Sequence, residues 1–225
     1  MNPILKRIIQ LLALTVLQAA LLCLSAWSLT WLEGWLYVGT YLFLIAAASL
    51  VMLPGRPEVV AERSKGTHGG KSWDLLLTRL MAIPSLGMLA VAGLDHRFGW
   101  KPDTGFAAQV LGMLLFILGY LLVLWAMYTN KFFSSVVRIQ KERGHRAVTN
   151  GPYHFIRHPG YVGMMTSGLG TVLLLNSAWA LIAWGLYGIM VVIRTALEDK
   201  TLQAELDGYK EFASHTRFRL IPGIW

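Results

Sequence analysis

The sequence predicts an all-α, polytopic integral membrane protein with five or six membrane helices. Composition is the first observation: 55% of the 225 residues are hydrophobic and only 14% are charged, and the mean hydropathy is +0.52. These values lie outside the range of ordinary soluble domains. The second observation is the length of the uncharged apolar runs, several of which approach the roughly 20 residues that a helix needs to cross the hydrocarbon core. The third is the placement of lysine and arginine between these runs.

Four apolar runs mark spans in the first 128 residues. Three of them predict spanning helices directly, and they cover residues 8–32, 35–53 and 106–128. A fourth run, residues 80–94, is short by itself. Residues 73–77 extend it to a full span if Arg79 reaches the interface or faces a polar interior.

The last part of the apolar sequence predicts a helical hairpin. Residues 160–175 and 179–193 are each shorter than a comfortable span, and only three residues separate them. This hairpin leaves the number of membrane elements at five or six. After Glu198, apolar side chains follow one stripe of a helix and charged side chains occupy the rest of its surface. The stripe predicts a C-terminal amphipathic helix that lies on the membrane or closes over a site, and it comprises Leu202, Leu206, Tyr209 and Phe212 or Ala213.

The basic residues predict the topology. All 20 lysine and arginine residues lie at the N-terminus, in the second and fourth connections or in the tail, except Arg97 and Lys101 in the third connection. By the positive-inside tendency, both termini and the long fourth connection are cytoplasmic. The net charge of +8 is therefore a topology signal, with attraction to membrane lipid headgroups as a further consequence. Nucleic acid is not an expected partner, because the basic residues line membrane edges. No protein partner is indicated.

The chain reads as one membrane domain, residues 1–225, with two functional parts. Residues 1–105 contain spans with few polar side chains, which suits a lipid-facing scaffold, whereas residues 106–225 hold most of the unusual polar chemistry. Two pairs of glycines, each seven residues apart, predict close helix packing in lipid. The alternative is that they make room for a flat cofactor or a lipid chain. The pairs are Gly112 with Gly119 and Gly163 with Gly170.

A polar segment, residues 129–161, separates the fourth span from the hairpin. Because Pro159 favours the first turn of a helix, Arg157 and His158 are expected at the entrance of the helix that begins near Gly160. Unpaired N–H groups at that entrance, together with the Arg157 charge, form a seat for a carboxylate. The alternative for both residues is an interfacial anchor.

A second polar group lies at the end of the hairpin. Arg194 and Glu198 are four residues apart, as are Thr195 and Asp199, so each pair shares one side of a helix. The spacing fits an intrahelical ion pair or a partly wet cavity that holds a ligand. The histidines do not have the spacing of metal ligands, so we expect no metal site.

With these residues in view, the sequence GHRAVTNGPYHFIRHPGYVG, followed by RTALEDKTL, GYKEF and RLIPGIW, resembles the isoprenylcysteine carboxyl methyltransferase family and related phospholipid methyltransferases. The resemblance covers about residues 130–225. It implies that S-adenosylmethionine is the cofactor and that Glu198 contacts it, while Arg194 faces the substrate. The family has two adjacent glutamates where this chain has Glu198 and Asp199. The other implied cofactor-binding residues are His145, Arg146, Ala147, Val148, Tyr153, His158, Pro159, Gly160 and Tyr161, with Arg157 beside them.

The resemblance implies methyl transfer to a hydrophobic or lipidic acceptor, with a carboxylate acceptor as in isoprenylcysteine carboxyl O-methylation. Three alternatives stay open at this point. A phospholipid N-methyltransferase would act on an amine, with Glu198 or Asp199 taking its proton. The motif RHP-x-Y also occurs in membrane reductases that use a nicotinamide cofactor, whose phosphates Arg138, Arg143 and Arg146 could bind. A scaffold or transporter would bind no cofactor.

Overall fold

The computed structural model describes residues 1–100, 102 and 104–225, and this part of the chain forms helices and turns without a strand. Lys101, one of the two basic residues of the third connection, lies outside the described residues. Five of the described helices are long and apolar enough to cross a membrane, so the chain is a multi-pass membrane protein. They are α1 (Pro3–Ala26), α2 (Leu32–Gly55), α4 (Ser72–Phe98), α5 (Phe106–Thr129) and α7 (Ala180–Glu205).

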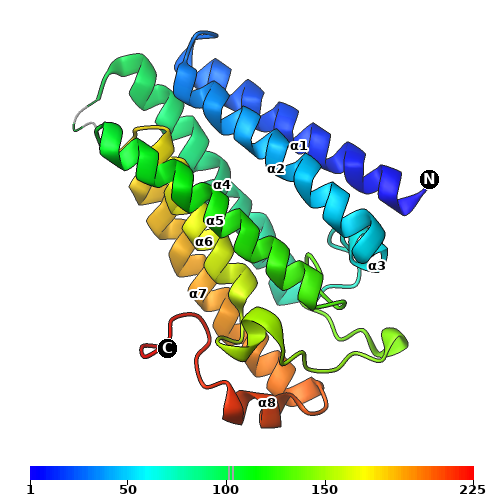
Figure 1. Cartoon of the computed structure of the whole chain (residues 1–225). Helices are drawn as coiled ribbons and strands as arrows, with labels where there is room; N and C mark the ends of the chain where they lie inside the picture. The colour runs from blue at the N-terminus through cyan, green and yellow to red at the C-terminus, as the bar shows by residue number, and fades with distance from the viewer. Residues whose placement is uncertain (101, 103) are drawn as a thin grey trace.

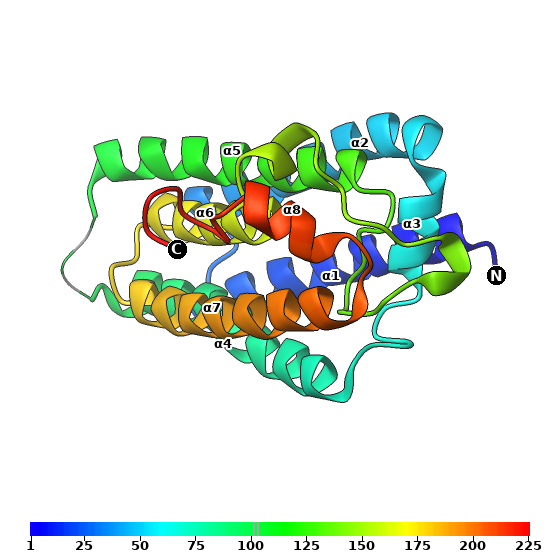
Figure 2. The ribbon, with the colours of Figure 1, turned by 90° about the horizontal axis from the view of Figure 1, so that it is seen from below.

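The long helices run side by side, and the short elements gather at one end of the bundle (Figures 1 and 2). That end also carries the N-terminus and the connection between α5 and α6, and the C-terminal tail runs from α8 back along the side of the bundle. The basic segments that predicted the topology therefore lie on one side of the bundle. The short elements are α3 (Pro57–Ser64), two 3₁₀ turns (Lys141–Arg143 and Gly151–His154) and α8 (Tyr209–His215).

Helix α1 differs from the predicted first span at both ends. It begins at Pro3, because the side chain of Asn2 accepts a hydrogen bond of 2.9 Å from the Ile4 amide and caps the first turn. It ends at Ala26, because Trp27 adopts a positive φ of 52°. The prediction that this helix runs to residue 32 was therefore wrong. The fourth run is confirmed as a full span, and Arg79 is exposed at its side.

The predicted hairpin is confirmed by α6 (Pro159–Leu174) and α7, which a short turn through Asn176 connects. Asn176 has a positive φ of 56°, and its side chain accepts a hydrogen bond of 2.7 Å from the Thr104 amide. At 16 residues, α6 is too short to span by itself. It lies along α5 inside the bundle instead.

The glycine pairs bring α5 and α6 into close contact. A Cβ atom on Gly119 would lie 2.4 Å from the Ser167 amide, and one on Gly170 would lie 2.2 Å from the Phe116 amide. No side chain fits at such distances, so the two backbones touch where these glycines meet. The prediction of close helix packing is confirmed. The packing fixes the start of α6, which directly follows the polar residues of the fourth connection.

The predicted amphipathic stripe is divided between two helices. Helix α7 continues to Glu205, and Gly208, with a φ of 76°, turns the chain into the short α8. Tyr209 and Phe212 are buried on the inner face of α8. The tail that follows is fixed by backbone hydrogen bonds, because the amides of Arg157 and His158 donate to the carbonyls of residues 218 and 219 at 2.9 and 3.0 Å.

Candidate active site

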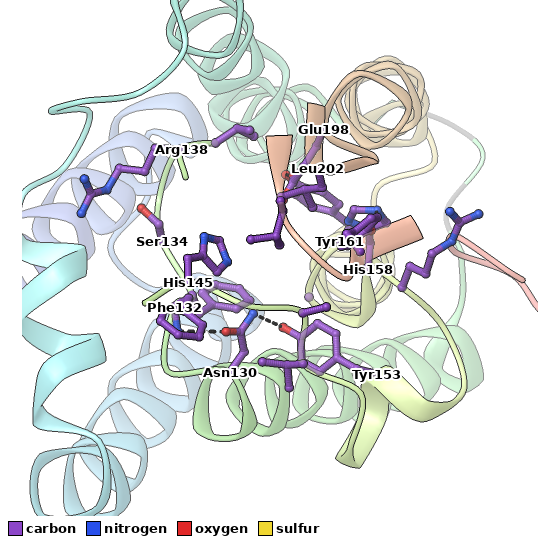
Figure 3. A pocket seen from close by; sticks show the side chains of 18 of the residues that line it. Asn130, Phe132, Ser134, Arg138, His145, Tyr153, His158, Tyr161, Glu198 and Leu202 are labelled. Atoms are coloured by element: carbon purple, nitrogen blue, oxygen red, sulfur yellow. Dashed lines mark hydrogen bonds between the residues drawn. The ribbon is translucent and has the colours of Figure 1, made fainter. Parts of the chain in front are cut away.

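A cavity with about 1030 Å³ of empty space opens at the end of the bundle that carries the fourth connection. Its walls come from that connection, α6, α7 and α8, and from Arg63 of α3 (Figure 3). We call it the site cavity. Every predicted site residue lines it except Pro159, which is fully buried in the first turn of α6. The lining residues that the sequence predicted are His145, Arg146, Ala147, Val148, Tyr153, Arg157, His158, Gly160, Tyr161, Arg194 and Glu198.

Glu198 is the one carboxylate among the described residues that line the site cavity. The Tyr161 hydroxyl donates a hydrogen bond to its Oε2 atom. The Tyr161 ring stacks on His158, with a centroid separation of 5.8 Å and an interplanar angle of 18°. A half-buried carboxylate beside aromatic rings suits a cationic ligand, because both the carboxylate and the ring faces attract positive charge.

Arg194 pairs with Asp74 of α4 and not with Glu198. Its Nε and Nη2 atoms donate to the two Asp74 carboxylate oxygens at 2.7 and 3.2 Å, and Nη2 also donates to the Ser135 carbonyl at 3.1 Å. The second Asp74 oxygen accepts a hydrogen bond of 2.7 Å from the Val137 amide. This buried network fixes the Arg194 guanidinium and attaches the fourth connection to α4. The expected intrahelical pair does not form, because Asp74 offers bidentate geometry.

Asp199, the residue that departs from the family pattern, is the centre of a second buried network. Its carboxylate accepts hydrogen bonds from Arg157 at 2.8 and 3.0 Å, from Tyr209 at 3.1 Å and from Arg219 at 2.9 Å. Arg157 also donates to the Arg217 carbonyl at 3.0 Å. The charge of Arg157 is therefore balanced by the protein itself. Asp199 thus pairs with Arg157 at the helix entrance where a ligand carboxylate was expected. The assignment of Arg157 to the cofactor stays a prediction.

His145 is held as a neutral ring in the wall of the site cavity. Its Nδ1 atom accepts a hydrogen bond of 3.3 Å from the Gln140 amide, so the proton of the neutral ring is assigned to Nε2. Burial, reinforced by the charges of Arg143 and Arg138, lowers the pKa of the His145 ring from 6.5 to about 4. The ring packs on Phe132, with centroids 4.5 Å apart. It therefore offers a hydrogen-bond donor without a charge.

Tyr153 forms the wall of the site cavity opposite α7 (Figure 3). Its hydroxyl accepts a hydrogen bond of 3.4 Å from the Asn130 side chain and donates one of 3.4 Å to the Ala126 carbonyl. Burial raises the pKa of the Tyr153 hydroxyl. Burial and the neighbouring Asp199 charge raise the pKa of Tyr209 in the same direction. Both phenols therefore stay protonated and neutral near pH 7.

Two of the arginines considered for phosphate binding are occupied within the protein. Arg138 donates to Glu62 at 2.8 Å and to Glu142 at 2.9 Å. Arg143 donates to the Gln140 side chain and, at 2.7 Å, to the Lys131 carbonyl. Because these guanidinium groups support the fold of the connection, they are not free to bind the phosphates of a nicotinamide cofactor.

Sequence reasoning did not identify several residues of the site. Asp74 and Arg63 belong to the part of the chain expected to be a lipid-facing scaffold, and Tyr209 belongs to the amphipathic stripe. A signal for Asp74 was available, because an acidic residue in the first turn of an apolar span needs a partner. No signal in the sequence indicated that Arg63 would face the same cavity.

Comparisons with known proteins agree with this geometry. Residues 110–204 match the isoprenylcysteine carboxyl methyltransferase family. The chain is 28% identical over 146 residues to a probable protein-S-isoprenylcysteine O-methyltransferase of Oryza sativa subsp. indica, covering 62% of this chain and 74% of the rice protein. It is 42% identical over 74 residues to the protein-S-isoprenylcysteine O-methyltransferase of Saccharomyces cerevisiae, covering 32% of this chain and 31% of the yeast protein.

The protein-S-isoprenylcysteine O-methyltransferase of Homo sapiens is 38% identical over 82 residues, covering 34% of this chain and 29% of the human protein. These relatives are all named as O-methyltransferases, and none of these comparisons supports a reductase, an N-methyltransferase or a transporter. The matched segment contains Tyr161, Arg194 and Glu198, which the fold brings together at one cavity. Over residues 110–204 this chain is similar to the isoprenylcysteine carboxyl methyltransferase family.

Proposed function

We propose that this membrane methyltransferase transfers the methyl group of S-adenosylmethionine to the carboxylate of a lipidic acceptor, with a prenylated cysteine as the model acceptor. The observation that carries the proposal is the site cavity itself, where Glu198 is paired with Tyr161 and the fixed guanidinium of Arg194 lies on the same helix. A carboxylate for the cationic cofactor and a cation for the anionic acceptor thus face one space.

The residues present fit the cofactor. S-adenosylmethionine carries a positive sulfonium, an amino acid group and an adenine ring. The lining of the site cavity offers one carboxylate, several aromatic rings and an aliphatic surface for these groups. Glu198 would balance its positive charge, and the rings of Tyr161 and Tyr209 would pack against its flat or cationic parts. His145 to Val148, Tyr153 and His158 to Tyr161 would form the remaining contacts.

The carboxylate acceptor explains which residues the site does not need. A carboxylate is already ionised near neutral pH, so no side chain has to remove a proton from it. When bound, the cofactor supplies an electrophilic methyl group: the acceptor oxygen forms a bond to this carbon while the carbon–sulfur bond breaks. The chain therefore has to align the acceptor and exclude water. Asp74 and the Ser135 carbonyl hold Arg194 still for the first task.

Exclusion of water would depend on the C-terminal elements. Tyr209 and Phe212 of α8 line the site cavity, and the tail is attached through Arg219 to Asp199 at 2.9 Å. We infer that the termini and the fourth connection face the cytoplasm, because the basic segments gather at this end of the bundle. A water-soluble cofactor would enter there. A lipidic acceptor would arrive from the bilayer.

The test is incubation of membranes that contain the protein with S-adenosylmethionine labelled on the methyl group, followed by alkaline treatment of the extracted lipid and protein. A methyl ester releases volatile labelled methanol, whereas a methylated amine keeps its label. We expect the wild-type protein to release volatile label and the Glu198→Ala variant to release none. The control is Glu205→Ala, which should keep the label, because Glu205 lies at the end of the same helix and forms an exposed ion pair with Lys71. Stable label would identify an amine acceptor instead, and labelling that survives Glu198→Ala would remove Glu198 from the site.

A further inference from the structure

Arg63 of α3 lies between two cavities. It lines the site cavity, and it also lines a second cavity with about 780 Å³ of empty space among α1, α2, α3 and α5. Among the described residues, it is the one that the two linings share. We call the second space the apolar cavity, because most of its lining is aliphatic and includes Ile8, Leu11, Ile45, Met52, Leu124 and Met127.

The guanidinium of Arg63 has no counterion in the described part of the chain. Its Nε and Nη1 atoms are buried without a hydrogen-bond partner, and its Cζ atom lies 5.4 Å from the centroid of the Phe133 ring. Neighbouring buried arginines are different, since Arg194 has Asp74 and Arg157 has Asp199. A buried charge without a partner is unfavourable unless a ligand completes it.

The nearby acidic side chains do not form an ion pair with Arg63. Glu62, its neighbour on α3, points to Lys65 at 2.8 Å and to Arg138 at 2.8 Å. The described lining of the apolar cavity contains no carboxylate, but it contains a second arginine, Arg7, whose guanidinium donates to the Gln10 side chain at 3.4 Å. The polar end of the apolar cavity is therefore positively charged.

The positive charge persists at neutral pH. Burial, together with the charge of Arg7, lowers the pKa of Arg63 to about 9. At pH 7 the guanidinium remains protonated, so it can bind an anion. Its surroundings combine this cation with an aliphatic cavity on one side and the site cavity on the other. An amphiphile with one anionic end matches that arrangement.

We propose that Arg63 binds the carboxylate of the methyl acceptor, while the lipid tail of the acceptor occupies the apolar cavity. The proposal rests on the proposed function and adds a substrate-binding residue outside the matched segment, residues 110–204. Because Asp74 neutralises Arg194, Arg63 supplies the net charge that attracts the carboxylate, and the fixed Arg194 guanidinium orients it in the site cavity. An acceptor held in this way would present its anionic end to the site cavity and keep its tail away from the cofactor.

The test is equilibrium binding of a fluorescent S-farnesylcysteine and of its methyl ester to the full-length protein in nanodiscs. The wild-type protein should bind the acid at least about tenfold more tightly than the ester. Arg63→Gln should abolish this preference and Arg63→Lys should restore part of it, with S-adenosylmethionine affinity changed by less than about twofold. Lys65→Gln, which removes an exposed charge just after the same helix, is the matched control.

Binding does not require turnover, so the two proposals can fail separately. If the protein binds the acid through Arg63 but transfers no methyl group, the proposed function fails and the acceptor site stands. An unchanged preference in Arg63→Gln overturns the acceptor site. Competition between phosphatidylglycerol and the acid for Arg63 would also overturn it, because a phospholipid would then be the occupant of the apolar cavity.

Binding of the lipid tail of the acceptor is tested independently of binding of its carboxylate. Ala48 lines the apolar cavity, so Ala48→Phe should weaken binding of the farnesyl compound at least about tenfold and leave a short S-prenyl analogue within about twofold. Leu50→Phe is the control, because Leu50 is 79% exposed on the same helix. Equal loss for the long and short compounds would place the tail elsewhere and overturn this part of the proposal.

Discussion

Asp74 and Arg194, 120 positions apart in the chain, form a bidentate ion pair with N–O distances of 2.7 and 3.2 Å. The pair joins the first turn of α4 to the part of α7 that lines the site cavity. Asp74 is fully buried, and Arg194 is 7% exposed. Removal of one partner leaves the other as a buried, uncompensated charge.

Asp74→Ala should therefore lower the free energy of unfolding by about 3–5 kcal/mol. The double variant Asp74→Ala/Arg194→Met should recover part of this loss, because it removes both charges. Denaturant titration in mixed micelles measures both effects. Glu205→Ala, which breaks the exposed pair with Lys71, should change the same quantity by less than about 1 kcal/mol. A double variant as unstable as the single one would contradict this explanation.

The hydrogen bond from Tyr161 to Glu198 is expected to orient the carboxylate for the cofactor. Tyr161→Phe keeps the ring and removes the hydroxyl, so the affinity for S-adenosylmethionine should fall by roughly 1 kcal/mol, or about fivefold. Isothermal titration calorimetry measures this affinity. Tyr187→Phe is the control, since Tyr187 lies on α7 but does not line the site cavity. Equal affinity in both variants would show that Glu198 needs no such support.

His145 should make the protein less stable in acid. The pKa of its ring is about 4 in the folded protein and 6.5 in the unfolded chain. The neutral form is therefore favoured by folding, so stability is complete above pH 6.5 and is lost as the pH falls toward 4. Because the ring is partly exposed and solvent screens it, the loss should stay below about 1.4 kcal/mol per pH unit, the value for a full proton difference.

His145→Gln removes this titration, so the pH dependence of the unfolding midpoint between pH 4 and 6.5 should become shallower. His215→Gln, which replaces an exposed histidine on α8, should keep the wild-type dependence. An equally steep dependence in His145→Gln would assign the acid sensitivity to other groups.

The close contact between α5 and α6 should not tolerate a side chain at its centre. Gly170→Ala places a Cβ atom 2.2 Å from the Phe116 amide, so the free energy of unfolding should fall by about 1–3 kcal/mol. Gly185→Ala on α7 meets no atom within 4 Å and should be neutral or stabilising by up to about 1 kcal/mol. Denaturant titration measures the free energy of unfolding of both variants. Equal values would mean that α5 and α6 can move apart without a loss of stability.

The fold was largely predictable because bilayer thickness sets the length of apolar runs. Helices α2 and α5 and the α6–α7 hairpin lie close to the predicted ranges. The end of α1 was not predictable, because a tryptophan gives no sign that it will adopt a positive φ. The end of α7 was placed too early, because charged residues that face a cavity look like the start of an aqueous segment.

The site was predictable where one segment carries it and not where a distant helix completes it. Tyr161 and Glu198 lie within residues that the family resemblance covers. The partner of Arg194 could not be read from spacing, since Glu198 is four residues away but Asp74 has the better geometry. Arg63 could not be found for the same reason, because its role depends on how α3 packs against the connection between α5 and α6.

The ion pair between Glu62 of α3 and Arg138 of the fourth connection, at 2.8 Å, bears on how this protein could be re-engineered. Both acidic groups that hold that connection, Glu62 and Asp74, are encoded before residue 106. A chimera that joins residues 106–225 to the spans of another protein would therefore inherit orphaned arginines unless matching acids were grafted with them. The segment by which the family is recognised is thus not a transplantable module, and its neighbours must be exchanged together with it.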